Sequence, residues 1–399
     1  MMGSSSSFLP TRRGRVEVSN YKLLRYSLYC ALFFILLSGV YRGILPFGDE
    51  PDFDVRAPRI VLDSHPSWSP YNWLSPLYDD MQYLSHCEID ATPLSLSATI
   101  DAESCSESLY QRSTRWFLMI ILSAPLLFSS VFYYRKNDGV DVRHRMHSLA
   151  LSLIFPGAIY YLGVFAEEQF SLIVSLLCFM YWKRKLLILF LIAIVLLLDF
   201  GSGLVVASFF SMALFYTFVN KRLGFGNACL IMLIQVVCCY AIGFSILEYT
   251  KSISFLANKS EAILLALESK VLIDKYPLVL RPIITFMSFV FYTPAFLKVP
   301  VVYVIVGIAC LFSLFKTYMK RGSISGNDFL ESLLLSVISI SFIVSFVFLF
   351  PSYANAKYYI FLLPFVICPL LYIYDNYLLL LFFVTLNIFV FLHVIYFSI

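Results

Sequence analysis

Long apolar stretches recur along the chain, and they constrain its fold more than any other feature. A helix that crosses a bilayer needs about 20 mostly apolar residues. Stretches of about this kind lie near residues 24–44, 115–134, 148–165, 169–182, 186–199, 203–219, 228–247, 299–315, 329–350, 358–374 and 377–397. With 60% hydrophobic and 14% charged residues, the composition is not that of an ordinary soluble domain. We therefore expect an all-α polytopic membrane protein with about 11 transmembrane helices.

One further apolar segment, 281–297, is interrupted by Pro282 and Pro294. Proline lacks the backbone N–H that a helix interior needs. This segment is therefore expected to re-enter the membrane, to lie at its interface or to form a twelfth span.

Lysine and arginine residues predict the orientation of these helices, because cytoplasmic loops carry an excess of both. They gather in the N-terminal arm and in alternate connections: Arg12, Arg13, Arg15, Lys22 and Arg25; Arg135, Lys136, Arg143 and Arg145; Lys183, Arg184 and Lys185; Lys221 and Arg222; Lys316, Lys320 and Arg321. The N-terminus is therefore expected in the cytoplasm. The predicted organisation is a cytoplasmic basic arm, 1–25, and a single transmembrane domain, 26–399, with long outer loops at 45–114 and 248–298.

Three carboxylates, Asp49, Glu50 and Asp52, lie within four residues at the start of the first outer loop. Carboxylates beside a membrane are costly to hold, which favours a functional role. Pro51 stiffens the backbone between them. A fixed carboxylate can act as a general base on a hydroxyl or bind a hard divalent cation. The plain alternative is an acidic, solvated start of the loop. We expect Asp49 to be the base, with Glu50 and Asp52 as the other candidates.

A second acidic pair, Glu167 and Glu168, lies in the short turn between two apolar stretches. Adjacent residues at a helix end point about 100° apart, so one glutamate can face the bundle while the other faces water. Equally, both can stabilise the N-terminus of the following helix, where negative charge is favourable. The sequence leaves these two interpretations open.

Two cations on the predicted outer face, Arg281 and Lys357, run against the orientation bias and need a reason. Phosphate groups attract both residue types, so we expect Arg281 and Lys357 to bind phosphate. Tyr353 and Tyr358 flank Lys357 and are candidate contacts of the same substrate. The alternative is that the cations are anchors whose charged ends reach the lipid headgroups.

Two of the nine cysteines, Cys87 and Cys105, lie in the long polar loop 45–114. If this loop faces an oxidising compartment, the two can form a disulfide. Two free thiols are the equal alternative.

The motifs described so far resemble those of the GT-C membrane glycosyltransferases. Gly48-Asp49-Glu50-Pro51-Asp52 stands where that family keeps its catalytic acidic motif. Phe155-Pro156-Gly157-Ala158-Ile159-Tyr160, followed by Ala166-Glu167-Glu168, is similar to the family's proline-containing third span and second acidic turn. The segment from Tyr353 to Pro364 is similar to its late outer segment, with Lys357 where arginine is usual. This resemblance covers the architecture and about 30 residues of motif.

The resemblance implies a polyprenyl-phosphate-linked sugar as donor and a glycan acceptor. It is compatible with a divalent cation, Mg²⁺ or Mn²⁺, for which Asp49 and Glu168 are the candidate ligands. The expected activity is inverting sugar transfer on the periplasmic face of a bacterial inner membrane, to a lipid-linked or surface glycan such as O-antigen.

Two alternatives remain at this stage. One is a Wzy-like polymerase of O-antigen or capsule, although such polymerases typically have a large late loop and here the largest outer loop comes first. The other is a flippase or transporter of lipid-linked oligosaccharides. The sequence has no internal repeat, which many transporters show, and almost no charge within its apolar stretches. It also has no P-loop, no HExxH and no basic, aromatic-interleaved surface, so we expect no nucleic-acid partner.

Overall fold

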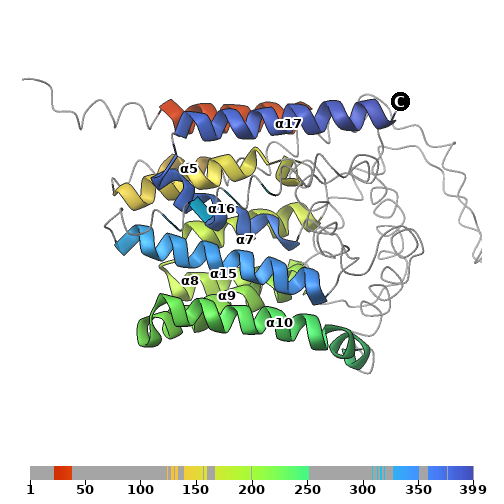
Figure 1. Cartoon of the computed structure of the whole chain (residues 1–399). Coiled ribbons are helices and arrows are strands. Elements are labelled where there is room, and N and C mark those ends of the chain that lie inside the picture. Colours follow the sequence, from red (N-terminus) through yellow and green to blue (C-terminus); the bar gives the residue numbers. More distant parts are fainter. Residues whose placement is uncertain are drawn as a thin grey trace, which may run out of the picture.

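The described part of the chain is built from helices that run roughly parallel and antiparallel to one another (Figure 1). The computed structural model describes residues 22–37, 139–155, 157–159, 167–198, 200–250, 327–349, 358–374 and 376–398, with a few helical residues between 124 and 133 and between 308 and 319. No strand occurs in these ranges. The expected all-α class is thereby confirmed for the residues that the structure describes.

Most helices lie where the apolar stretches predict them. The helix at residues 22–37 is followed by α5 (Val140–Leu153), α7 (Glu167–Met180), α8 (Lys185–Leu198), α9 (Phe200–Leu223), α10 (Phe225–Thr250), α15 (Asn327–Leu349) and α17 (Asn376–Ser398). Long apolar runs without proline leave helix as the structure that satisfies the backbone internally. The loops 45–114 and 248–298, and the segment 281–297, lie outside or almost wholly outside the described residues.

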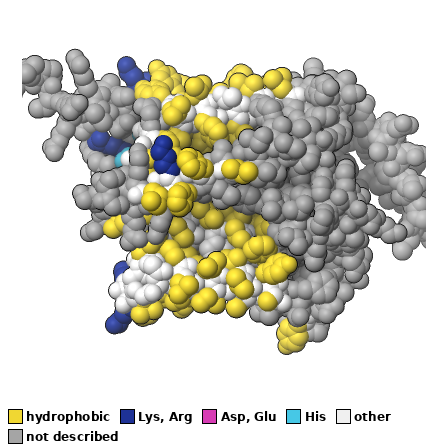
Figure 2. Space-filling view, in the orientation of Figure 1, with side chains coloured by type: hydrophobic (Ala, Val, Ile, Leu, Met, Phe, Trp, Pro, Cys, Tyr) yellow, Lys and Arg dark blue, Asp and Glu magenta, His cyan; other side chains and the backbone are white. Residues whose placement is uncertain are grey.

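Two of these helices, over Gly201–Leu223 and Asp328–Leu349, are long and apolar enough to cross a membrane, judged by length and composition within the described residues. Several outward faces are apolar as well. Figure 2 shows hydrophobic side chains over much of the visible face. On α10 the exposed ones include Leu230, Leu233, Ile234 and Val237. A large apolar surface of this kind is typical of contact with lipid rather than water.

The start of the predicted helix at 148–165 is wrong, because α5 begins at Val140; α5 ends at Leu153, residues 157–159 are helical again, and 160–165 lie outside the described residues. The first half of α5 was expected in a polar connection, since it contains Arg143 and Arg145. Arg145 is nevertheless 5% exposed and lies 3.6 Å from Glu331 of α15, so its charge is compensated inside the bundle. The helix ends just before Pro156, and proline disfavours helical geometry in the residue ahead of it.

The predicted helix at 358–374 is present but broken into three pieces: η5 (Ile360–Leu362), α16 (Leu363–Ile367) and η6 (Cys368–Tyr372). Pro364 and Pro369 occupy the first turns of α16 and η6. Ser148 of α5 donates a hydrogen bond to the Pro364 carbonyl, and Ser336 of α15 donates one of 3.5 Å to the Val366 carbonyl. Hydroxyls of neighbouring helices therefore satisfy carbonyls where the helix is irregular, as an apolar environment requires.

This broken segment is central to the packing. It contacts α5, α7 and α15, and Figure 1 shows α16 among the helices rather than at an edge. Phe365 packs edge-to-face on Phe179, with ring centroids 4.7 Å apart, and Phe209 packs on Phe361, Phe365 and Phe342 at 5.3–5.6 Å. Interlocked aromatic rings from α7, α9, α15 and the broken segment thus form the core of the described bundle.

Helices α8 and α9 approach each other unusually closely. A Cβ atom placed on Gly203 would lie 2.4 Å from Cα of Leu196 and 2.6 Å from its backbone nitrogen. Only glycine leaves room for two backbones at this separation. Gly203 therefore fixes the geometry of the α8–α9 hairpin, whose turn lies next to the site described below.

Candidate functional site

The structure places the predicted site residues in three groups. Most lie outside the described residues: Asp49, Glu50, Asp52, Arg281, Tyr353, Lys357, and the cysteines Cys87 and Cys105. Glu167 and Glu168 form the first turn of α7, described for its backbone alone. Tyr358 is buried at the start of the broken segment, 7% exposed. Of the predicted site residues, the structure therefore describes the side chain of Tyr358 and the backbone at the beginning of α7.

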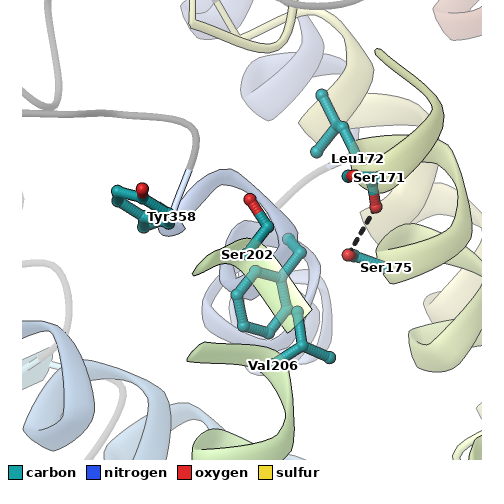
Figure 3. Close-up of a pocket in the computed structure, with 7 residues that line it drawn as sticks. Ser171, Leu172, Ser175, Ser202, Val206 and Tyr358 are labelled. Carbon is teal, nitrogen blue, oxygen red and sulfur yellow. Dashed lines mark hydrogen bonds between the residues drawn. The ribbon is translucent and has the colours of Figure 1, made fainter. Parts of the chain in front are cut away.

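Tyr358 lines a small cavity together with residues of α7 and α9 (Figure 3). The lining residues are Ser171, Leu172 and Ser175 of α7, Ser202 and Val206 of α9, and Tyr358 and Phe361. The space between these walls, including its opening, is about 250 Å³. The free space at its centre is about 10 Å³, which is room for one water-sized group.

The cavity lies where three elements begin. Ser171 is in the second turn of α7, Ser202 is in the first turn of α9, and Tyr358 precedes η5. The turns before these elements were all predicted on the outer face. Glu167 lies four residues before Ser171, about 6 Å along the helix axis. The fold thus brings together two predicted parts of the site, the acidic turn of α7 and Tyr358.

The cavity is polar through hydroxyl groups. Ser175 Oγ donates a hydrogen bond of 2.6 Å to the Ser171 carbonyl, the bond drawn in Figure 3. Ser171 is 2% exposed, and its own Oγ has no hydrogen-bond partner among the described residues. Ser202 adds a third buried serine. An unpaired buried hydroxyl is costly, and a ligand or water that bonds to it removes that cost.

The remaining walls are apolar or aromatic. Leu172, Val206 and Phe361 stand beside the phenol ring of Tyr358, and none of the described lining residues is charged. The serines were missed in the sequence, although Ser171 and Ser175 are spaced four apart and therefore share one face of an otherwise apolar helix. That spacing could have indicated a polar site on α7, but serine also occurs often in such helices for packing alone.

A second polar cluster lies at the other end of α7. Trp182 Nε1 donates a hydrogen bond of 3.1 Å to Glu331 Oε1, the same oxygen that lies 3.6 Å from Arg145 Nη2. Lys183 and Asp328 form a more exposed pair at 3.9 Å. Ser171 and Met180, the last residue of α7, are nine residues apart, so about 14 Å of α7 separates the two clusters.

Basic side chains also gather at that second end. Figure 2 shows the Lys and Arg side chains of the described residues toward one side of the visible face. The described basic residues there include Arg143 in the first turn of α5, Lys185 at the start of α8, Lys221 and Arg222 in the last turn of α9, and Lys183 in the turn between α7 and α8. The cavity and the basic end are therefore at opposite ends of the bundle, which agrees with the alternation that the sequence predicts.

No group of three or more His, Cys, Asp or Glu side chains able to hold a metal occurs within the described ranges. The two candidate ligands, Asp49 and the carboxylate of Glu168, fall outside what the structure describes. Comparison with protein-family models, curated proteins and solved structures finds no match to this chain.

Proposed function

We propose that this chain is a polytopic membrane protein that transfers a sugar from a polyprenyl-phosphate-linked donor to a glycan acceptor, with inversion at the anomeric carbon. The reaction takes place on the outer face of a bacterial inner membrane. The proposed architecture is GT-C-like, with about 11 transmembrane helices and an acidic loop on the outer face.

One observation carries the proposal: the starts of three elements that follow turns predicted on the outer face line a single cavity. Glu167 and Glu168 begin the helix that supplies Ser171, and Tyr358 stands across from it. The cavity combines hydroxyl groups with aromatic and aliphatic walls. Ligand sites commonly have this composition, a mostly apolar lining with a few placed polar groups.

The proposed step is a single displacement. The carboxylate of Asp49 accepts the proton of the acceptor hydroxyl, and the hydroxyl oxygen attacks the anomeric carbon from the side opposite the phosphate. The bond between the anomeric carbon and the phosphate oxygen breaks, and the polyprenyl phosphate leaves with the electron pair. Arg281 and Lys357 stabilise the charge on the departing phosphate. No part of this step is assigned to a metal ion.

The lack of charged residues in the described apolar helices favours an enzyme over a flippase. The segments 186–198, 203–219, 332–349 and 376–398 contain no Asp, Glu, Lys or Arg. Substrate pathways through membranes usually contain intramembrane ionisable residues. A site confined to one end of the bundle suits a reaction at the membrane surface.

The decisive experiment replaces Asp49 in a strain whose own copy of the gene is deleted. Asp49→Asn is expected to lower sugar transfer about 10²–10⁴-fold, the usual contribution of a general base. Glycans are analysed by mass spectrometry, and membrane levels of each variant are matched by immunoblot. Asp54→Asn, in the same loop, is the control and is expected to retain activity. Wild-type transfer by Asp49→Asn would remove Asp49 as the base.

The deletion strain itself separates the candidate functions. Loss of one sugar from the glycan supports the transferase. Chains limited to a single repeat indicate a polymerase, and complete absence of surface repeats indicates a flippase. An unchanged glycan in the deletion strain would contradict all three.

A further inference from the structure

We propose that the cavity between α7, α9 and Tyr358 binds an uncharged hydroxyl group of a sugar, and that it excludes phosphate. This assignment deepens the proposed function and rests on it for the identity of the sugar as part of a substrate. In the resting protein one water molecule occupies the position that the sugar hydroxyl takes.

The unpaired hydroxyl of Ser171 is the first reason. Ser171 lines the cavity, and its buried Oγ has no hydrogen-bond partner in the described part of the chain. A hydroxyl both donates and accepts one hydrogen bond, so a second hydroxyl, from water or a sugar, complements it. Ser175 already donates to the Ser171 carbonyl, which leaves its oxygen lone pairs able to accept a further bond.

Charge is the second reason. Phosphate sites depend on arginine, lysine or a cluster of backbone N–H groups. The described residues around this cavity supply no cation, and the helix that provides Ser171 begins with Glu167 and Glu168. Acidic residues in the first turn offset the positive end of a helix, which makes this helix start less favourable for an anion. The phosphate of a lipid-linked sugar is therefore expected to bind elsewhere.

Size and shape are the third reason. The free space of about 10 Å³ admits one water-sized group, such as the hydroxyl of a sugar whose ring stays at the opening. The walls formed by Leu172, Val206 and the rings of Tyr358 and Phe361 suit the C–H surface of a sugar ring beside its hydroxyl. A ligand hydroxyl that reproduces the hydrogen bonds of an ordered water displaces it without loss.

The test uses a thiol introduced at the cavity. Ser171→Cys in the full-length protein, reconstituted in nanodiscs, is treated with methyl methanethiosulfonate, a small neutral thiol reagent. Peptide-resolved mass spectrometry measures the modification rate at position 171 separately from the native cysteines. Glucose, galactose, mannose, rhamnose and N-acetylglucosamine are added one at a time, and inorganic phosphate is added at the same concentration.

At least one monosaccharide is expected to slow the modification, by about threefold when it is present at twice its dissociation constant. Phosphate is expected to leave the rate unchanged. Ser202→Cys, on the opposite wall, keeps the Ser171 hydroxyl and serves as the second reporter, so absence of protection counts against the assignment only when both variants show it. Ser339→Cys is the control: Ser339 is fully buried on α15 and hydrogen-bonded to the Leu335 carbonyl, so no sugar should alter its modification.

Three results would overturn the assignment: protection by phosphate, absence of protection by every monosaccharide, or a cavity thiol that the reagent does not reach in the folded protein. Protection by a sugar in a protein whose deletion leaves the cellular glycan intact would keep the sugar-binding cavity and remove the transferase function. The two proposals can therefore fail independently.

Discussion

Replacing Gly203 by alanine tests the close contact between α8 and α9. The added Cβ would lie 2.4 Å from Cα of Leu196, whereas carbon atoms in good contact are about 3.5–4.0 Å apart. The α8 and α9 backbones must therefore separate by about 1 Å. Because the obstacle is backbone rather than the end of a flexible side chain, the cost should fall at the upper end of the ~1–3 kcal/mol typical of overpacking.

Alanine also favours a helix over glycine by about 1 kcal/mol, which offsets part of this cost. The expected net loss of stability for Gly203→Ala is about 2 kcal/mol. With an unfolding entropy of about 2.1 cal/mol/K per residue, this corresponds to a melting temperature about 2–3 °C lower. The assay is thermal unfolding of the purified protein in detergent, followed by the loss of the monomer peak in size-exclusion chromatography.

Gly226→Ala is the matched control, because a Cβ at Gly226 on α10 would meet nothing within 4 Å. This variant should keep or raise the melting temperature through helix propensity alone. A Gly203→Ala protein as stable as Gly226→Ala would refute the contact between α8 and α9. A shift of α9 would also move Ser202, so the same variant should weaken sugar protection at the cavity.

Two further pairs of variants separate buried from exposed interactions, each measured by the same thermal assay. Glu331→Gln leaves the buried Arg145 without its carboxylate and should cost about 1–2 kcal/mol, less than a fully buried pair because Glu331 is 37% exposed. Asp328→Asn removes an exposed pair and should change stability by less than about 0.5 kcal/mol; an equal loss in both variants would contradict the distinction. Ser148→Ala removes the hydrogen bond to the broken segment and should cost about 1 kcal/mol. Ser171→Ala loses no described protein partner and should leave stability nearly unchanged. A larger loss of stability for Ser171→Ala than for Ser148→Ala would show that the Ser171 hydroxyl is bonded within the protein.

The positions of most helices could be predicted from the sequence because length and apolarity decide them. The runs at 186–199, 203–219 and 329–350 leave the backbone no alternative to internal hydrogen bonds in an apolar environment. Their observed ends differ from the predicted ones by a few residues, since polar residues such as Lys221 and Arg222 continue the last turn of α9. Helix ends of this kind depend on neighbours rather than on hydropathy.

The start of α5 could not be predicted from hydropathy, because a charged residue such as Arg145 is expected in a loop unless it has a buried partner. Glu331 lies 186 residues further along the chain, and no local pattern links the two. The same holds for the broken segment: its prolines predict a kink, but the serines that satisfy its carbonyls come from α5 and α15. Long-range polar pairing decides both features.

Of the residues that line the cavity, Tyr358 alone was singled out from the sequence, because an aromatic residue beside a cation stands out next to an apolar stretch. That Glu167 and Glu168 belong to a site stays a prediction. The serine hydroxyls were not found, because one polar atom hardly changes the hydropathy of a helix. Their importance follows only from the packing that brings Ser171 and Ser202 to the same cavity and leaves the first without a described partner.

The absence of charge from the described walls of this cavity has a consequence for how the proposed sugar transfer would be arranged. Removing a carboxylate or an ammonium group from water costs several kcal/mol unless it is paired, as Arg145 is with Glu331 at the opposite end. A cavity embedded among helices is therefore better built from hydroxyls, which need one partner each. The charged groups of the reaction, the base and the phosphate-binding cations, are better placed in the outer loops, where water can reach them. On this reasoning the helices hold the sugar and the loops carry out the chemistry, so exchanging loop 45–114 should change the rate of transfer while sugar protection at Ser171 persists.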